Sequence, residues 1–268
     1  SHRAKFTPPA AQGLIDRPAL LQELSRRGPV VWIMGPPGAG KTSLAASFLE
    51  RWEGDRFWFQ LDAGDGDPAV LFENLEEAFR LSSRRRTPPL PVFSPARESA
   101  LQVYARSFFE RGCARFRNPG LLVFDNVQDL PSGSTSLSAI LESLEVLPPG
   151  FRMLVLSRQP PPPSCARLEA SGRLEVMTWD ELGESGEEAR ALLRLRLPRD
   201  CGEARIAELC RLADGWPAGL VLMASEARRL PLAGTDGLSQ EVLFDFFSCE
   251  VLREARPEVR EFLLAVSA

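Results

Sequence analysis

Eight consecutive residues, Gly35–Thr42, read Gly-Pro-Pro-Gly-Ala-Gly-Lys-Thr, a glycine-rich run that ends on a lysine and a hydroxyl side chain. Glycines let backbone amides turn inward around phosphate oxygens, and a helix that starts here adds the positive end of its dipole. Lys41 would meet the β- and γ-phosphates of a nucleotide, and Thr42 would offer its hydroxyl to Mg²⁺. The predicted nucleotide-binding residues of this segment are Pro37, Gly38, Ala39, Gly40, Lys41, Thr42 and Ser43.

A second chemical feature is an aspartate that follows four apolar residues, in the run Leu121–Asp125. A carboxylate at the end of a buried strand commonly holds a phosphate-bound Mg²⁺, so we predict that Asp125 and Thr42 bind the metal. A cap after the strand is the alternative role for Asp125. The next residue is Asn126, whose amide positions water but cannot accept its proton. Hydrolysis of a bound nucleotide should therefore be slow unless Asp129 or another acid substitutes.

Arg158 follows a later apolar run and would lie near a γ-phosphate if that run is a strand of the same sheet. It is a candidate phosphate sensor, and a surface arginine at a strand end is the alternative. Three acids, Asp62, Asp65 and Asp67, mostly suit turns and helix caps, with one of them reaching the metal as the alternative. The predicted catalytic residues are thus Lys41, Asp125, Asn126 and Arg158.

The choice of nucleotide follows from lysine usage. GTPases of the usual kind recognise guanine with an Asn-Lys-x-Asp motif, and no lysine follows Lys41 in this chain. ATP and ADP are therefore the predicted ligands. Lys5 and Lys41 are the only lysines, so a lysine retained inside the glycine-rich run also indicates a site where a guanidinium group does not serve.

Composition excludes several kinds of chemistry. His2 is the only histidine, which argues against Ser-His-Asp triads, Cys-His pairs and histidine-rich zinc sites. The five cysteines include no Cys-x-x-Cys pair, so we expect buried reduced thiols. A net charge of −4 argues against a nucleic-acid-binding surface in this segment. Without a signal pattern or a run of roughly 18 uncharged apolar residues, we expect a soluble cytoplasmic protein that binds no membrane.

Short apolar runs alternate with helical patterns in the first two thirds of the chain. Buried strands separated by helices form a mainly parallel sheet covered on both faces, so we predict an α/β P-loop fold with a parallel five-stranded sheet. Helices are expected over Thr42–Trp52 and Ala69–Arg80, the second capped by Asp67 before Pro68. The expected strands are Pro29–Met34, Phe57–Leu61, Leu121–Asp125, Met153–Ser157 and Leu174–Met177.

From Glu184 onward every periodic segment is helical and no strand candidate remains. Helices are expected over Glu187–Arg196, Glu203–Leu212, Ala218–Arg229 and Gln240–Arg253. A last amphipathic helix, Arg256–Ala268, ends on an apolar run, which suggests truncation. We predict a tag remnant and N-terminal arm over 1–12, a P-loop nucleotide-binding domain over 13–181, a helical domain over 182–235 and the start of a further domain over 236–268.

Six motifs together are quite specific, although only the glycine-rich run is specific by itself. They are Leu14-Ile15-Asp16-Arg17-Pro18, the run Gly35–Thr42, Trp58-Phe59-Gln60-Leu61-Asp62 with Asp65-Gly66-Asp67-Pro68, Phe124-Asp125-Asn126, Leu156-Ser157-Arg158 and Ala213-Asp214-Gly215-Trp216-Pro217-Ala218-Gly219-Leu220. With these motifs, nearly the whole chain resembles the STAND class of signal-transduction ATPases, and within it the MalT-like ATP-dependent transcriptional regulators.

The resemblance implies an ASCE-type nucleotide domain, a helical lid over 182–235 and a winged helix that begins within 236–268. It implies that Ile15, Asp16 and Arg17 line the adenine site, that Pro217 touches the base or ribose from the lid, and that Arg158 is the sensor arginine. Such proteins resemble switches: ADP favours a closed form, and ATP with an inducer favours an open, self-associating form. Many members carry a second acid where this chain has Asn126.

The expected function is therefore an ATP/ADP-binding, Mg²⁺-dependent regulatory switch with slow hydrolysis and self-association in the ATP state. The inducer-sensing and DNA-binding domains would lie outside this chain. One alternative is a continuously hydrolysing AAA+-like ATPase, which would need a glutamate after the metal-binding aspartate and an arginine finger supplied in trans. Another is a small-molecule kinase. Turnover rate separates the first two functions, and product analysis identifies the third.

Overall fold

The structure, a computed structural model, describes residues 2–10, 17–83, 89–94, 100–116, 120–183, 185–198 and 201–229. The chain divides into two compact units. The first comprises Ser1–Pro36 and Lys41–Leu182, and the second comprises Pro37–Gly40 and the chain from Gly183 onward. The predicted site residues Ile15 and Asp16, the helix expected over 240–253 and the expected winged-helix start at 236–268 lie outside the described residues.

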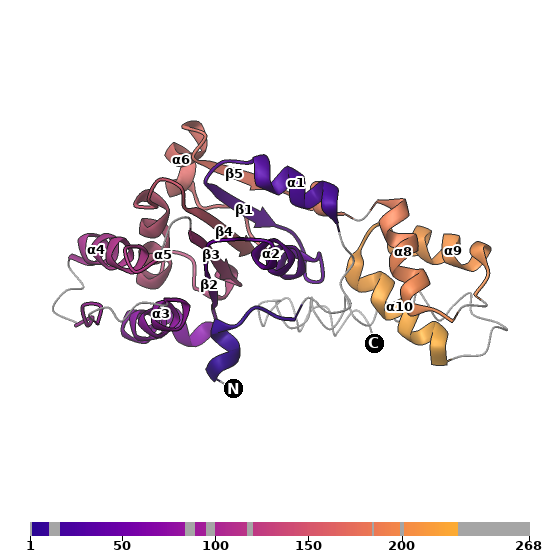
Figure 1. The fold of residues 1–268 in the computed structure, drawn as a ribbon, viewed down its shortest axis with the longest axis horizontal. Coiled ribbons are helices and arrows are strands. Elements are labelled where there is room, and N and C mark those ends of the chain that lie inside the picture. Colours follow the sequence, from indigo (N-terminus) through magenta and orange to yellow (C-terminus); the bar gives the residue numbers. More distant parts are fainter. Residues whose placement is uncertain are drawn as a thin grey trace, which may run out of the picture. The chain divides into compact units, whose positions relative to one another are not determined.

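A five-stranded sheet forms the centre of the first unit (Figure 1). All neighbouring strands pair in parallel, in the order β2-β3-β4-β1-β5, so their carboxyl ends lie at one edge. The predicted parallel five-stranded sheet is confirmed, with small shifts at the strand ends. The strands are β1 (Val30–Met34), β2 (Asp55–Gln60), β3 (Gly120–Asp125), β4 (Arg152–Ser157) and β5 (Leu174–Met177).

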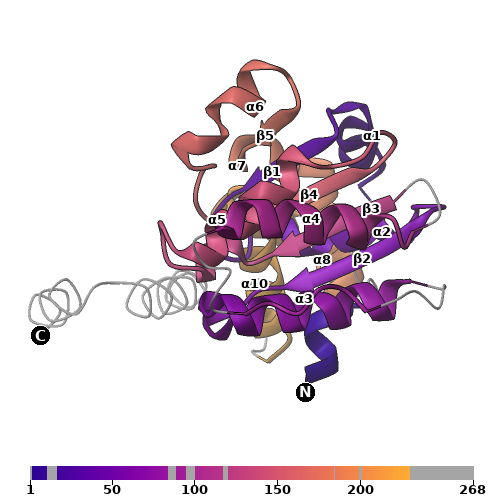
Figure 2. The same cartoon turned by 90° about the vertical axis from the view of Figure 1, so that its left-hand side faces the viewer.

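Helices cover both faces of this sheet. α1 (Pro18–Arg26) and α2 (Lys41–Glu50) lie on one face. The opposite face, turned toward the viewer in Figure 2, carries α3 (Pro68–Ser82), α4 (Leu101–Cys113) and α5 (Thr135–Glu145). The short helices α6 (Ala166–Ala170) and α7 (Trp179–Leu182) follow β4 and β5. No helix in the described ranges has both the length and the apolar character required to cross a membrane.

Phenylalanine rings fill the space between the sheet and helices α3 and α4. The rings of Phe57 on β2 and Phe79 on α3 have centroids 4.6 Å apart, and both side chains are fully buried. A Cβ atom on Gly112 of α4 would lie 2.5 Å from the Phe79 ring, so glycine lets α4 approach this close. Other rings in this core belong to Phe59, Phe72, Phe108, Phe109 and Phe124.

The N-terminal arm packs on the edge strand β2. Its 3₁₀ helix η1 (His2–Phe6) places the Phe6 ring 5.8 Å from that of Phe59. The Lys5 Nζ lies 2.7 Å from a carboxylate oxygen of Asp62 and 2.6 Å from one of Asp65. The Asp65 side chain is fully buried, and the hydrogen bond from Lys5 is the main cause that lowers the pKa of Asp62. The arm is therefore part of the first unit's packing.

The three acids after β2 act as caps. Asp62 and Asp65 form a reciprocal capping box around the 3₁₀ helix η2 (Ala63–Gly66), and Asp67 accepts a hydrogen bond from the Ala69 amide at the start of α3. The turn-and-cap interpretation is confirmed, because the side chains of all three accept hydrogen bonds from nearby backbone amides.

The second unit contains α8 (Gly186–Arg196), α9 (Glu203–Ala213) and α10 (Pro217–Arg229). Ser185 caps α8 in a capping box with Glu188, and Arg194 bonds to Glu203 across α8 and α9. The periodic apolar side chains pack against one another inside the unit. The buried ones include Leu192, Leu193, Ile206, Leu209, Leu220 and Met223.

Candidate functional site

The parallel strands bring predicted phosphate and metal residues of the first unit to one edge of the sheet. β1 leads into the glycine-rich loop, β3 ends on Asp125, and β4 ends on Ser157, directly before Arg158. The Gly35 amide donates to the Ser157 carbonyl at 3.3 Å, which ties the start of the loop to the end of β4. This carboxyl edge is where ligands bind in open α/β sheets.

Lys41 is the first residue of α2, and its ammonium group folds back on the loop. Its Nζ donates to the carbonyl oxygens of Gly35 at 2.6 Å and Pro36 at 3.0 Å. The pKa of Lys41 is lowered to about 8, mainly by burial and secondly by the charge of Arg158, against the opposing charge of Asp125. A partly desolvated cation of this kind gains from a phosphate ligand.

Thr42 and Asp125 form the second part of the site. The Thr42 hydroxyl lies 3.0 and 3.3 Å from the two Asp125 carboxylate oxygens and donates to this carboxylate. Asp125 is 1% exposed, and burial raises its pKa against the opposing hydrogen bonds from Thr42 and the Asn126 amide. Both of these donors are neutral. A buried carboxylate beside a hydroxyl, with no charged donor hydrogen-bonded to it in the described chain, fits a hydrated Mg²⁺ ion.

Asn126 turns the chain out of β3. Its backbone is left-handed, with φ 60° and ψ 40°, a conformation that asparagine adopts more readily than most residues. Its Oδ1 accepts a hydrogen bond from Gln128 Nε2 at 3.3 Å. Asp129, the predicted substitute acid, is exposed and accepts from the same amide group at 3.1 Å. The position next to Asp125 thus holds a neutral amide.

Sequence reasoning missed Gln128, which links two of the predicted site residues. Its Oε1 accepts from the Arg158 backbone N–H at 3.1 Å, and its Nε2 donates to Asn126. Arg158 is half-buried, and its charge acts on Lys41. A glutamine in a short turn has no sequence signal of its own; only the proximity of the ends of β3 and β4 reveals its contacts.

The tip of the glycine-rich loop, Pro37–Gly40, belongs to the second unit. Within that unit the Trp216 indole donates to the Pro37 carbonyl at 3.0 Å, and the Ala218 amide donates to the Gly38 carbonyl at 3.2 Å. Gly38 has φ 72°, and a Cβ atom on it would lie 2.3 Å from that of Ala218. Both the backbone conformation and the close approach require glycine at this position. The sequence-based prediction gave no role to Trp216.

The other predicted binding residues have varied environments. Pro217 begins α10, and a Cβ atom on Gly40 would lie 3.6 Å from its Cγ within the second unit. Arg17 is half-buried and donates to the Leu182 carbonyl at 2.7 Å within the first unit. The roles of Arg17 and Pro217 at the base or ribose stay predictions. Ala39 is buried, and Ser43 is half-buried in the first turn of α2.

Known proteins match this chain over nearly its whole length. A family model described as an AAA domain matches residues 24–154. The HTH-type transcriptional regulator MalT of Serratia proteamaculans is 27% identical over 270 residues, 97% of this chain. The serine/threonine-protein kinase PknK of Mycobacterium tuberculosis is 28% identical over 284 residues, 98% of this chain. The alignments cover 29% and 24% of these relatives, so the chain spans less than a third of their length.

A solved structure shares the fold. The ORC1 protein of Aeropyrum pernix, solved in complex with DNA, matches with a TM-score of 0.59 and 15% sequence identity, over 97% of this chain and 74% of that one. Identity this low shows the fold alone. The shared feature is an α/β P-loop arrangement with a parallel sheet followed by helices.

Proposed function

The chain contains an AAA-type P-loop ATPase domain with MalT-like homologues that align over nearly all of it, and we propose that this nucleotide-binding module is a regulatory switch in a bacterial signal-transduction protein. ATP and ADP bind at the same site, hydrolysis is slow, and the bound nucleotide sets the conformation. By analogy with the MalT regulators, the output is control of transcription, through domains outside this chain.

One observation carries the proposal: groups suited to bind phosphate and Mg²⁺ lie together with a neutral amide at the position where a base would act. Lys41, Thr42 and Asp125 supply the first set. Asn126 occupies the next position, and its amide can hold a water molecule but cannot take its proton. Tight binding without efficient hydrolysis suits a protein that reports which nucleotide is bound rather than one that turns over continuously.

In this proposal each group has a defined task. Thr42 and Asp125 hold Mg²⁺, which neutralises charge on the phosphates. Lys41 exchanges its carbonyl partners for phosphate oxygens and gains a stronger, charge-assisted bond. Arg158 contacts the γ-phosphate and so distinguishes ATP from ADP. Gln128 bonds to the Arg158 backbone amide and to the Asn126 side chain, so a shift of the Arg158 backbone on contact with the γ-phosphate also moves the Asn126 side chain.

Hydrogen bonds at the start of α10 support the proposal that the second unit responds to the bound nucleotide. Trp216 and Ala218 donate to backbone carbonyls of the loop tip Pro37–Gly40, inside the same unit. A nucleotide that changes the loop tip therefore changes bonds made by α10. A nucleotide shifts the conformational equilibrium only as far as its affinities for the two forms differ, so ATP and ADP must act differently on these contacts. Self-association in the ATP state is the proposed consequence.

Identification of the bound nucleotide, with turnover measured on the same sample, tests the proposal. The purified protein is denatured, the released nucleotide is identified by chromatography, and ATP turnover is timed. We expect retained ADP and turnover below about one per minute, against roughly 1–1,000 per second for ordinary enzymes. Lys41→Ala should abolish retention, whereas Arg80→Ala, at an exposed arginine of α3, should not.

The match to an AAA domain keeps a continuously hydrolysing ATPase as the second candidate. An empty site with rapid turnover would favour that function and contradict the switch. A phosphorylated small molecule among the products would instead indicate a kinase.

A further inference from the structure

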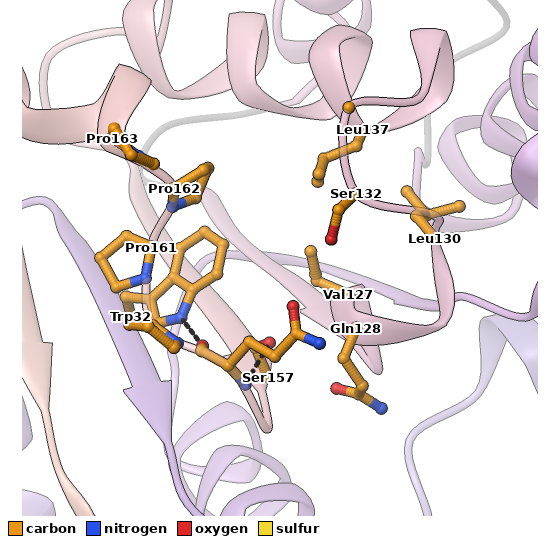
Figure 3. Close-up of a pocket in the computed structure, with 13 residues that line it drawn as sticks. Trp32, Val127, Gln128, Leu130, Ser132, Leu137, Ser157, Pro161, Pro162 and Pro163 are labelled. Carbon is orange, nitrogen blue, oxygen red and sulfur yellow. Dashed lines mark hydrogen bonds between the residues drawn. The ribbon is translucent and has the colours of Figure 1, made fainter. Parts of the chain in front are cut away.

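A cavity lies at the carboxyl edge of the sheet in the first unit, on the side covered by α5 (Figure 3). It encloses about 420 Å³, within the range of roughly 300–1,000 Å³ typical of small-molecule sites. The proline run Pro160–Pro163 forms one wall, and the segment from Val127 to Leu137 forms the other. Trp32 of β1 closes it beneath the prolines.

This cavity differs from the phosphate site in both position and chemistry. Neither the loop Gly35–Thr42 nor Asp125 is among the residues that line it. Its walls are mostly apolar, with Leu130 and Leu137 facing the prolines, and none of the described lining residues has a charged side chain. An ion placed there would lose its hydration without gaining a counter-charge. The walls therefore suit a neutral, largely apolar molecule.

The cavity is walled by a hydrogen-bonded tryptophan and a proline run, and it has a few polar groups. The Trp32 indole N–H donates to the Gln159 carbonyl at 2.9 Å, which fixes the ring under the proline run. Proline backbones have a fixed φ and lose little entropy when a ligand packs on them. The Ser132 hydroxyl, labelled in Figure 3, is a polar group that can orient a ligand, whereas the Gln128 amide is already hydrogen-bonded to Arg158 and Asn126. An apolar cavity with few polar groups is the usual form of a small-molecule site.

One wall of the cavity is connected to the proposed γ-phosphate sensor. Gln128 lines the cavity and accepts a hydrogen bond from the Arg158 backbone amide at 3.1 Å. Its Nε2 donates to Asn126 at 3.3 Å. The flanking residues of Arg158, Ser157 and Gln159, also line the cavity. A molecule that displaces Gln128 or the proline run must therefore move the backbone that carries Arg158.

We infer that this cavity is an effector site for a small, uncharged, largely apolar organic molecule, coupled to the nucleotide through Gln128. Binding at the cavity is independent of the proposed switch function, whereas the coupling rests on it. The two are tested separately.

The first experiment measures binding in the absence of nucleotide, with the neutral naphthalene dye Prodan as the probe and its emission shift as the readout. Saturable binding is expected. Ser132→Trp and Leu137→Trp, which fill the cavity from its α5 side, should each weaken binding at least about tenfold, or about 1.4 kcal/mol. Val103→Trp, at an exposed position of α4, adds the same side chain away from the cavity and should leave binding unchanged. Far-ultraviolet circular dichroism checks that each variant is folded.

No saturable binding, or equal binding by the wild type and both filled variants, would overturn the site. This result does not depend on whether the protein hydrolyses or retains ATP. A failure here therefore leaves the proposed function untouched.

The second experiment compares the probe's dissociation constant in protein saturated with ADP and with a non-hydrolysable ATP analogue. Coupling predicts a difference of at least about fivefold, and the probe must change the ratio of nucleotide affinities by the same factor. Gln128→Leu keeps a similar size but removes the hydrogen bonds. This variant should still bind the probe, and the ratio of its probe dissociation constants in the two nucleotide states should fall toward one. Equal probe affinities in the two wild-type states would refute the coupling while leaving the site itself established.

Discussion

The residue type at position 126 affects both the backbone turn after β3 and the capacity of the site to activate water. The left-handed φ of 60° favours asparagine, aspartate or glycine over glutamate, so the sharp turn after β3 selects against a long acid. Asn126 satisfies the turn and supplies an amide to Gln128. The sequence shows which residue stands there; the conformation explains why aspartate is the acid that could replace it without strain.

Asn126→Asp is expected to raise ATP turnover at least about tenfold, because a positioned general base contributes roughly 10²–10⁴-fold. Turnover is measured by phosphate release at saturating ATP and Mg²⁺. Asn126→Gly keeps the left-handed turn without a carboxylate and should remain slow. Equal rates for the aspartate variant and the wild type would show that a missing base does not limit hydrolysis.

The lowered pKa of Lys41 predicts how nucleotide affinity depends on pH. In the free protein this pKa is about 8 instead of 10.5, and a bound phosphate keeps the ammonium group protonated to higher pH. Binding therefore takes up a proton above pH 8. The dissociation constant for ADP should rise by up to about tenfold per unit above pH 8.

The measurement is a titration with ADP in EDTA, so that metal binding does not contribute. Lys41→Arg, whose guanidinium stays charged, should bind more weakly but lose the pH dependence. An affinity that stays level from pH 7 to 9.5 in the wild type would contradict the assignment.

At the scale of elements, helix spacing depends on residues with no evident chemistry. Gly112→Ala should destabilise the first unit by about 1–3 kcal/mol, because the new methyl group would meet the Phe79 ring at 2.5 Å and that ring is fully buried. Urea unfolding followed by circular dichroism measures the change. Gly66→Ala, where the nearest atom to an added Cβ is 3.7 Å away, is the control and should shift stability by less than about 0.5 kcal/mol. Similar values for both variants would show that α4 can move to accept the methyl group.

Element boundaries were predictable where capping residues mark them. Asp67 followed by Pro68 predicts the start of α3, and the side chain of Asp67 does accept the Ala69 amide. The helix predicted over Thr42–Trp52 ends two residues earlier, at Glu50. The sequence did not locate this end, because Arg51 and Trp52 are not helix-capping residues. The N-terminal arm was predicted as a segment, but its docking on β2 through Lys5 and Phe6 was not.

At the scale of the whole molecule, nucleotide binding should appear as added stability. A ligand that binds only the folded protein stabilises it by about 2.7 kcal/mol at a concentration of 100 times its dissociation constant. Excess ADP should therefore raise the thermal unfolding midpoint of the wild type and of Arg80→Ala. In Lys41→Ala the midpoint should not respond; an equal rise in that variant would place the nucleotide elsewhere.

The sequence by itself determined the features that depend on neighbouring residues. The glycine-rich run predicts phosphate binding because all of the residues that the motif needs lie within eight positions. Alternating apolar runs and helical patterns predict the parallel α/β fold. Capping acids and helix starts are equally local. These inferences needed no knowledge of which strands lie side by side.

Only the tertiary structure decided which distant residues meet. Thr42 and Asp125 are 83 positions apart in the sequence. They meet because the strand order β2-β3-β4-β1-β5 differs from the chain order and places the end of β3 near the loop that follows β1. The same proximity of strand ends joins Gln128 to Arg158 and opens the cavity beside them. Hydrogen bonds and cavities depend on positions in space, and a single sequence constrains those positions only through the completed packing.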